Sequence, residues 1–204
     1  LRSMLPLLAE RWLSIVAPGG FAVINFGDII SGRDAANTDD VCEYPMAVEY
    51  WPIFMSAGWL LWSRRIWCKP NARVAAPWCA SSNRAASDWE HVWTWKAPGD
   101  VRMGRQDKSQ MGWFDTSSEE GVDVGKHTHG AGMAVAVPVR MLAVHSVIGG
   151  AVHEPFCGTG TTLIACEQLN RQCRAIEIAP AYCQVTIDRW EQFTGAKAVK
   201  VAGA

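Results

Sequence analysis

Short apolar runs alternate along the chain with stretches whose apolar residues recur every three or four positions. The short runs predict buried strands at residues 21–26, 60–67, 91–95, 151–154 and 172–178. The three- and four-residue repeats predict helices at residues 2–16, 46–57, 139–148, 161–169 and 180–193. This alternation predicts an α/β fold. Strand, glycine turn, helix and strand follow one another in the last third, which predicts a βαβ unit with a right-handed crossover.

Polar and glycine-rich stretches lie between these elements. Residues 31–44 are expected to form a polar loop, and Pro52 is expected to break the helix at 46–57. Residues 97–132 are expected to form a long loop or insertion, and such a loop in a compact domain is usually functional or mobile. A length of 204 residues fits one domain.

Charge is unevenly distributed although the chain is close to neutral. The net charge is −1, yet residues 61–110 hold nine basic and four acidic side chains. Nine of the eleven tryptophans lie between Trp51 and Trp113, largely in the same stretch. A basic, aromatic-rich segment can follow a phosphate backbone and stack on bases. The alternative is an ordinary pair of strands with tryptophans in the core and solvated arginines outside.

Cysteine spacing and hydropathy argue against several classes of protein. The seven cysteines are odd in number and contain no C-x-x-C pair, so neither a metal site nor a disulfide framework is expected. No secretory signal is recognised. The longest uncharged stretch that could suggest a membrane span, residues 141–153, is shorter than the roughly 20 residues that a bilayer requires. We therefore expect no membrane association and an intracellular location.

The glycine turn of the predicted βαβ unit is the strongest candidate for a ligand site. Gly158 and Gly160 allow close approach of the backbone, and the following helix N-terminus favours a carboxylate or phosphate. Glu177 follows nineteen residues after Gly158, at the end of the next strand, where an acidic side chain accepts hydrogen bonds from ribose hydroxyls. A nicotinamide site is disfavoured because Leu163 replaces the third glycine. A phosphate-binding loop is disfavoured because its lysine is missing.

Two segments carry a resemblance to a known family. The run V-H-E-P-F-C-G-T-G-T-T at residues 152–162 resembles the motif V-L-D-P-F-x-G-S-G-T-T of the DNA amino-methyltransferases. The run R-A-I-E-I-A-P-A-Y at residues 174–182, followed by Arg189, resembles their next motif, x-x-G-I-E-I-x-P-x-Y. Residues 12–28, 58–69, 90–95 and 129–142 are similar, more loosely, to other segments of the family in its permuted order.

The resemblance implies a Rossmann-like S-adenosylmethionine methyltransferase fold with a mainly parallel sheet. It implies one domain at residues 1–195, divided into a half at 1–69, a target-recognition insertion at 70–126 and a cofactor-binding half at 127–195, with a tail at 196–204. Members methylate the exocyclic amino group of adenine or cytosine with S-adenosylmethionine. The cofactor residues expected here are Glu154, Pro155, Phe156, Gly158, Thr159, Gly160, Thr161, Thr162 and Glu177. The expected contacts to double-stranded DNA are Arg64, Arg65, Lys69 and Arg73.

The family's catalytic motif, Asp/Asn/Ser-Pro-Pro-aromatic, does not occur in these 204 residues. In the family this motif holds a flipped-out base in line with the methyl group, so positioning does most of the catalysis. The permuted order would place the motif upstream of Leu1, and no catalytic residue is therefore assigned. We expect a fold that is incomplete at its N-terminus, with strands 21–26 and 151–154 separated by a gap or paired directly.

Two readings of function follow. The first is a cytoplasmic DNA methyltransferase of a restriction-modification system, of bacterial or phage-like type. The second is a non-catalytic cofactor- or DNA-binding module completed by a partner chain. The partner expected is either a different chain or a second copy of this chain in a homodimer.

Overall fold

The computed structural model describes residues 2–31, 42–69, 89–101, 112–115 and 133–201, and these fall into two compact units. The first unit contains the described residues up to 115, and the second contains residues 133–201. Each unit has its own buried hydrophobic cluster.

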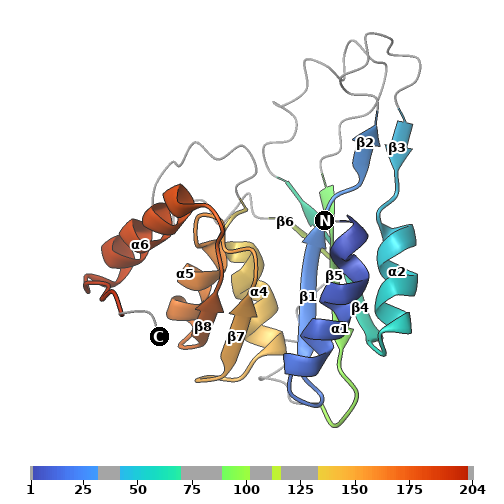
Figure 1. Ribbon diagram of the computed structural model, residues 1–204, viewed down its shortest axis with the longest axis horizontal. Helices are drawn as coiled ribbons and strands as arrows, with labels where there is room; N and C mark the ends of the chain where they lie inside the picture. Colours follow the sequence, from blue (N-terminus) through green and yellow to red (C-terminus); the bar gives the residue numbers. More distant parts are fainter. Residues whose placement is uncertain (1, 32–41, 70–88, 102–111, 116–132, 202–204) are drawn as a thin grey trace. The chain divides into compact units, whose positions relative to one another are not determined.

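The first unit contains a mixed four-stranded sheet (Figure 1). Its strands lie in the order β1 (Phe21–Phe26), β5 (Trp89–Lys96), β4 (Leu60–Cys68) and β6 (Trp113–Asp115). β5 runs antiparallel to both β1 and β4, whereas β6 runs parallel to β4. The prediction of a mainly parallel sheet is therefore not confirmed here. β5 follows β4 in the chain but inserts between β4 and β1, in the opposite direction to both.

Two helices supply the apolar side chains that pack against one face of this sheet. They are α1 (Leu5–Ile15), which follows the short 3-10 helix η1 (Arg2–Met4), and α2 (Ala47–Ser56). The predicted break at Pro52 is wrong, because α2 continues through this residue. Tyr50 and Phe54, on either side of Pro52, are both buried in the core and so anchor the helix on each side of the missing N–H.

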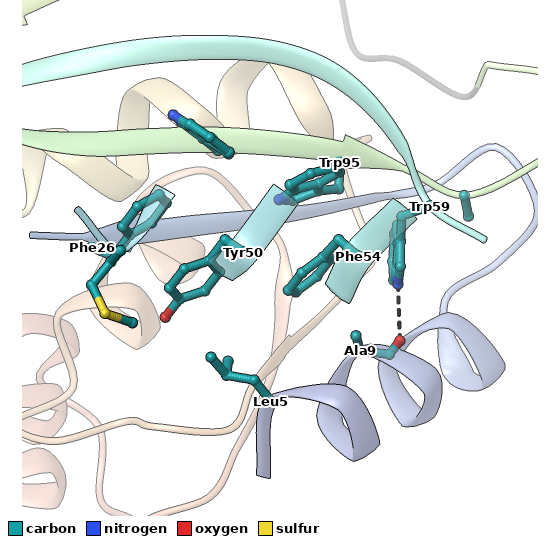
Figure 2. Close-up of a cluster of buried hydrophobic side chains, with 10 residues drawn as sticks. Leu5, Ala9, Phe26, Tyr50, Phe54, Trp59 and Trp95 are labelled. Atoms are coloured by element: carbon teal, nitrogen blue, oxygen red, sulfur yellow. Dashed lines mark hydrogen bonds between the residues drawn. The ribbon is translucent and has the colours of Figure 1, made fainter. Parts of the chain in front are cut away.

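Aromatic rings fill the core between these helices and the sheet (Figure 2). Phe54 of α2 stacks on Trp95 of β5, with 4.9 Å between ring centroids. Trp59 is fully buried, and its indole Nε1 donates a hydrogen bond of 2.9 Å to the carbonyl oxygen of Ala9 in α1. Trp59, Trp93 and Trp95 therefore have a structural role, in line with the alternative of tryptophans in the core, whereas Trp51 and Trp62 are 44% and 42% exposed.

The predicted polar loop at residues 31–44 is wrong at both of its ends. β2 (Ile29–Ser31) pairs antiparallel with β3 (Cys42–Tyr44), so the chain forms a short two-stranded sheet there. Residues 32–41 between them lie outside the described part of the chain.

The second unit contains the predicted βαβ arrangement. β7 (Ala151–Glu154) leads through the glycine turn into α5 (Thr161–Gln168), and β8 (Gln172–Ala175) returns parallel to β7. Two further helices, α4 (Ala136–His145) and α6 (Pro180–Thr194), complete the unit. Ile164 and Ala165 of α5 are fully buried and form its core with Val135. The strand–turn–helix–strand prediction is confirmed.

Several sequence-based expectations lie beyond what the described residues test. Among the described strands, β1 pairs only with β5 and β7 pairs only with β8. The relation predicted between β1 and β7, the single domain at 1–195 and the tail at 196–204 stay predictions. Most of the proposed target-recognition insertion, residues 70–126, lies outside the described residues. Within the described part, no helix is both long and apolar enough to span a bilayer, and no three His, Cys, Asp or Glu side chains cluster as metal ligands would.

Candidate functional site

The glycine turn joins the end of β7 to the start of α5. Gly158 and Gly160 have φ angles of +53° and +84°, in the left-handed region that glycine adopts without strain. Space is a second reason for glycine at position 160. A Cβ atom there would lie 2.8 Å from Cγ2 of Thr186 on α6, which is too close for any real contact. The turn therefore depends on glycine both for its conformation and for its packing.

Glu177 lies across the turn from Gly158. The parallel pairing of β7 and β8 extends past both strands, because the N–H of Ile176 donates to Glu154 O (2.9 Å) and the N–H of Cys157 donates to Ile176 O (3.0 Å). One carboxylate oxygen of Glu177 accepts from the N–H of Gly158 at 2.7 Å, and the other accepts from the N–H of Ala179 at 2.8 Å. Two backbone donors thus fix the orientation of the carboxylate at the end of β8.

The remaining candidate cofactor residues belong to the same turn. The side chain of Glu154 accepts a 3.0 Å hydrogen bond from the N–H of Phe156, and this bond fixes the backbone where the turn begins. Pro155 lies between these two residues, and Thr159 lies between the two glycines. Thr161 and Thr162 begin α5, where the first backbone N–H groups of a helix have no partner within the helix. The structure therefore brings all nine candidates together, around a helix N-terminus that favours an anion.

Three residues near the turn are not among the site residues predicted from the sequence, although Ile178 and Arg189 belong to the segment that carries the family resemblance. Ile178, directly after Glu177, is 96% exposed. Thr186 and Arg189 come from one face of α6 and hydrogen-bond to the turn from the side of that helix. Their three-residue spacing on a predicted amphipathic helix was the available signal, since it places both on the same face.

The thiol at the centre of the turn is not a nucleophile at neutral pH. Cys157 is buried, and this burial raises the pKa of its thiol to about 11. A thiol with this pKa is protonated at pH 7, and the thiolate is the reactive form. This thiol is therefore not expected to act as a nucleophile.

Two of the predicted DNA contacts, Arg64 and Arg65, lie on opposite faces of the sheet. Arg64 pairs with Trp93 and Arg65 pairs with Val92 across the β4–β5 ladder, so the two arginines point to opposite faces of the sheet. Arg64 is exposed, whereas Arg65 is half-buried and its pKa is lowered by that burial. Neighbouring residues of a strand alternate between faces, so Arg64 and Arg65 do not lie together on one face of the sheet, and their contacts to DNA stay predictions.

Lys69, another predicted DNA contact, forms an ion pair. The Nζ of Lys69 lies 2.5 Å from a carboxylate oxygen of Glu90 at the start of β5, so its charge is balanced locally. Arg73 lies outside the described residues. Arg64 is thus the exposed basic residue among the three that the structure describes.

A glycine turn between strand and helix, with an acidic side chain at the end of the next strand, defines a class of α/β proteins that bind adenosine-containing cofactors. Within that class, the family model described as DNA methylase matches residues 5–188. The chain belongs to this family.

Individual relatives agree with the family. The chain is 31% identical over 142 residues to the Type II methyltransferase M.BglI of Bacillus subtilis. This alignment covers 67% of this chain and 40% of that protein. It is 26% identical over 190 residues to the Type II methyltransferase M.MjaI of Methanocaldococcus jannaschii, covering 83% of this chain and 60% of that one. The chain thus spans about half the length of these curated relatives.

Solved structures share the fold. The protein TTHA0409 of Thermus thermophilus, in its complex with S-adenosyl-L-methionine, superposes with a TM-score of 0.71 at 21% identity, over 94% of this chain and 77% of that one. The PvuII DNA methyltransferase, which is cytosine-N4-specific, gives a TM-score of 0.77 at 15% identity, over 95% and 74% of the two chains. At these identities the similarity concerns the fold alone.

Proposed function

We propose that this chain binds S-adenosylmethionine at the glycine turn and serves the methylation of an exocyclic amino group of adenine or cytosine in double-stranded DNA. The observation that carries the proposal is the carboxylate of Glu177, held at 2.7 Å from the N–H of Gly158 at the end of β8. Family membership supports the same chemistry, and the two Type II methyltransferases among its relatives support DNA as the substrate.

The ribose of the cofactor is assigned to Glu177. Each carboxylate oxygen has two lone pairs, and the backbone N–H groups of Gly158 and Ala179 each occupy one. We assign the ribose hydroxyls to this carboxylate because an acidic side chain at the end of this strand accepts hydrogen bonds from a ribose. Because the backbone donors already fix the carboxylate, it loses little conformational freedom when the ribose binds.

The adenine ring is assigned to the apolar side chains beside this carboxylate. Ile178 is 96% exposed and Phe156 is 56% exposed, so both leave apolar surface in contact with water beside the turn. An aromatic base that covers them would remove apolar surface from water, at about 25 cal/mol for each Å² buried. The carboxylate of the methionine part is assigned to the N-terminus of α5, where the first N–H groups and the helix dipole favour an anion.

Calorimetric titration with S-adenosylmethionine tests the proposal. Glu177→Gln keeps the size of the side chain but removes its charge, and it should raise the dissociation constant about 5- to 150-fold, which corresponds to about 1–3 kcal/mol for a charged hydrogen-bonding group. Glu191→Gln is the matched control, because this carboxylate pairs with Lys197 at the end of α6. An unchanged dissociation constant for the Glu177 variant, with its thermal unfolding intact, would overturn the assignment.

Methyl transfer is tested separately from binding. In the family it depends on the Pro-Pro motif, which these 204 residues do not contain. The assay supplies labelled S-adenosylmethionine and double-stranded DNA and measures the label in the DNA. Transfer supports an enzyme that is active as this chain. Binding without transfer supports either the module completed by a partner chain or a fragment of an enzyme that lacks the catalytic motif. Binding of NAD in place of S-adenosylmethionine would instead indicate an oxidoreductase.

A further inference from the structure

Two cysteines of the second unit come together where helix α5 turns back into strand β8. The N–H of Arg171 donates to the carbonyl oxygen of Cys166 at 2.8 Å, and Asn170 has a φ of +55°. This is the Schellman arrangement, in which a left-handed residue reverses the chain at the C-terminus of a helix. Cys173 follows two residues after Arg171, so the reversal returns it alongside Cys166.

The two thiols are in direct contact. The thiol of Cys173 donates a hydrogen bond to the sulfur of Cys166. Cys166 is 1% exposed on α5, whereas Cys173 on β8 is half-buried, and both are free thiols. On β8, Cys173 pairs with Val152 of β7. Local chain geometry thus holds two reduced sulfur atoms next to each other in the cofactor-binding half.

The hydrogen bond makes the two sulfur atoms chemically unequal. A donated hydrogen bond stabilises the thiolate of the acceptor, so the pKa of Cys166 is lowered and the pKa of the donor Cys173 is raised. The positive charge of Arg171 also lowers the pKa of Cys166. Burial raises the pKa of Cys157, another thiol of this unit, to about 11. Because the thiolate is the reactive form, Cys166 is the thiol of this group that an oxidant should attack first.

We propose that Cys166 and Cys173 form a reversible disulfide when the protein is exposed to a peroxide. The sulfur of Cys166 takes one oxygen atom from hydrogen peroxide, whose O–O bond breaks, and becomes a sulfenic acid while one water leaves. The sulfur of Cys173 then attacks this sulfur, the S–O bond breaks, and a second water carries away the oxygen with the thiol proton. Two electrons pass from the two sulfur atoms to the peroxide.

Cys173 acts as the resolving thiol of this pair. A sulfenic acid without a neighbouring thiol is oxidised further to a sulfinic acid, which ordinary reductants do not reverse. At Cys166 that product would place a negative charge in a buried part of α5. The disulfide is neutral, returns to two thiols with a reductant, and restrains the unfolded chain by closing the loop between α5 and β8. The pair therefore protects the second unit from irreversible oxidation.

Peptide mapping of the whole chain tests the proposal. Trypsin cleaves after Arg171, so Cys166 falls in the peptide 141–171 and Cys173 in the peptide 172–174. After the folded chain is treated with hydrogen peroxide and the remaining thiols are alkylated, the two peptides should be joined, with a mass about 2 Da below the sum of their masses. Dithiothreitol should separate them. The unfolding temperature of the oxidised chain should be higher than that of the reduced chain.

Single substitutions identify the partners and the resolving role. Cys157→Ser and Cys183→Ser each remove another thiol of the unit and should leave the peptides joined. Cys173→Ser should abolish the link and leave Cys166 as a sulfinic acid, a gain of about 32 Da at this residue that dithiothreitol does not reverse. Cys166→Ser should also abolish the link, which covers the case in which Cys173→Ser does not fold.

Two results would overturn the inference. One is a pair of separate peptides from folded, oxidised wild-type chain. The other is loss of the link in Cys157→Ser, because it would make Cys157 the partner of Cys173. These measurements use neither S-adenosylmethionine nor DNA, so their outcome is independent of the proposed function.

Discussion

At the scale of single residues, both the backbone conformation and the packing at position 160 require glycine. Its φ of +84° disfavours any side chain, and Thr186 occupies the place of a Cβ atom. Gly149 has a similar φ of +75°, but nothing lies within 4 Å of the position of its Cβ. The two glycines therefore separate backbone strain from steric overlap.

Gly160→Ala should destabilise the protein by about 2–4 kcal/mol, because it adds overlap with Thr186 to the strain of a left-handed alanine. Gly149→Ala should cost about 1–2 kcal/mol, since only the strain applies. Urea unfolding of both variants measures the difference. The double variant Gly160→Ala/Thr186→Ala should recover part of the loss relative to the two single variants added together. Equal costs for the two glycines would show that the turn adjusts to a Cβ without loss.

His91 is the second residue whose surroundings allow a prediction. Its ring lies among those of Phe26, Trp89 and Trp93, with centroid distances of 4.9, 4.8 and 5.7 Å. Burial lowers the pKa of His91 below its usual value of 6.5, Asp28 at 3.8 Å opposes the shift, and Arg64 adds to it. Burial has the largest effect, so the neutral form is favoured in the folded protein.

The lowered pKa makes stability depend on pH in one direction. Between the folded pKa of His91 and 6.5, the unfolded chain binds more protons, so stability increases with pH and is fully present above pH 6.5. The free energy of unfolding should therefore fall as the pH drops below 6.5, and His91→Phe should remove much of that fall. Asp28→Asn should extend the fall in stability to lower pH, because Asp28 raises the pKa of His91. An identical pH profile in the His91→Phe variant would contradict the assignment.

At the scale of elements, the sequence predicted the second unit better than the first. The strand, turn, helix and strand around Gly158 are contiguous in the chain, so local pattern and turn chemistry determine them, and Glu177 could be placed by counting residues. The position of β5 between β1 and β4 depends on pairing between residues as distant as Phe26 and His91, which no local pattern contains. The contacts of Arg189 and Thr186 with the turn are long-range for the same reason.

The alternation of side chains along β4 gives the prediction that belongs to this scale. Arg64 is exposed on the face that carries Trp93, whereas Arg65 is half-buried on the face that carries Val92. If Arg64 contacts a DNA phosphate, Arg64→Glu should weaken binding to any DNA sequence and lower the slope of log affinity against log salt concentration by about 1. Arg65→Glu places a carboxylate in a partly buried position, and its main effect should be a lower unfolding temperature.

Fluorescence anisotropy with a labelled duplex at several salt concentrations measures the DNA affinity of the Arg64→Glu variant. Calorimetric unfolding measures the unfolding temperature of the Arg65→Glu variant. Arg174→Glu, an exposed substitution on β8, provides a control for the change in net charge. If Arg64→Glu and Arg174→Glu weaken binding equally, the effect comes from net charge and Arg64 is only a solvated residue.

At the scale of the whole molecule, each of the two units contains a buried hydrophobic cluster. The core of the first unit joins α1 and α2 to the sheet through rings such as Phe54 and Trp95, and the core of the second surrounds Ile164 and Ala165. Because each unit contains a cluster of its own, we expect each unit to unfold as a cooperative unit. A ligand that binds only the folded second unit should then stabilise that unit alone, by about 2.7 kcal/mol at a ligand concentration of 100 times the dissociation constant.

Hydrogen exchange with and without S-adenosylhomocysteine tests this prediction on the intact chain. The slowest amides of α5 and β8 should exchange about 100-fold more slowly with the ligand at that concentration, because they exchange through unfolding of the second unit. The amides of β5, which is paired on both sides by β1 and β4, should be unchanged. Equal protection of β5 and α5 would contradict independent unfolding, because it requires the two cores to open in one step. Protection of β5 alone would contradict binding at the glycine turn.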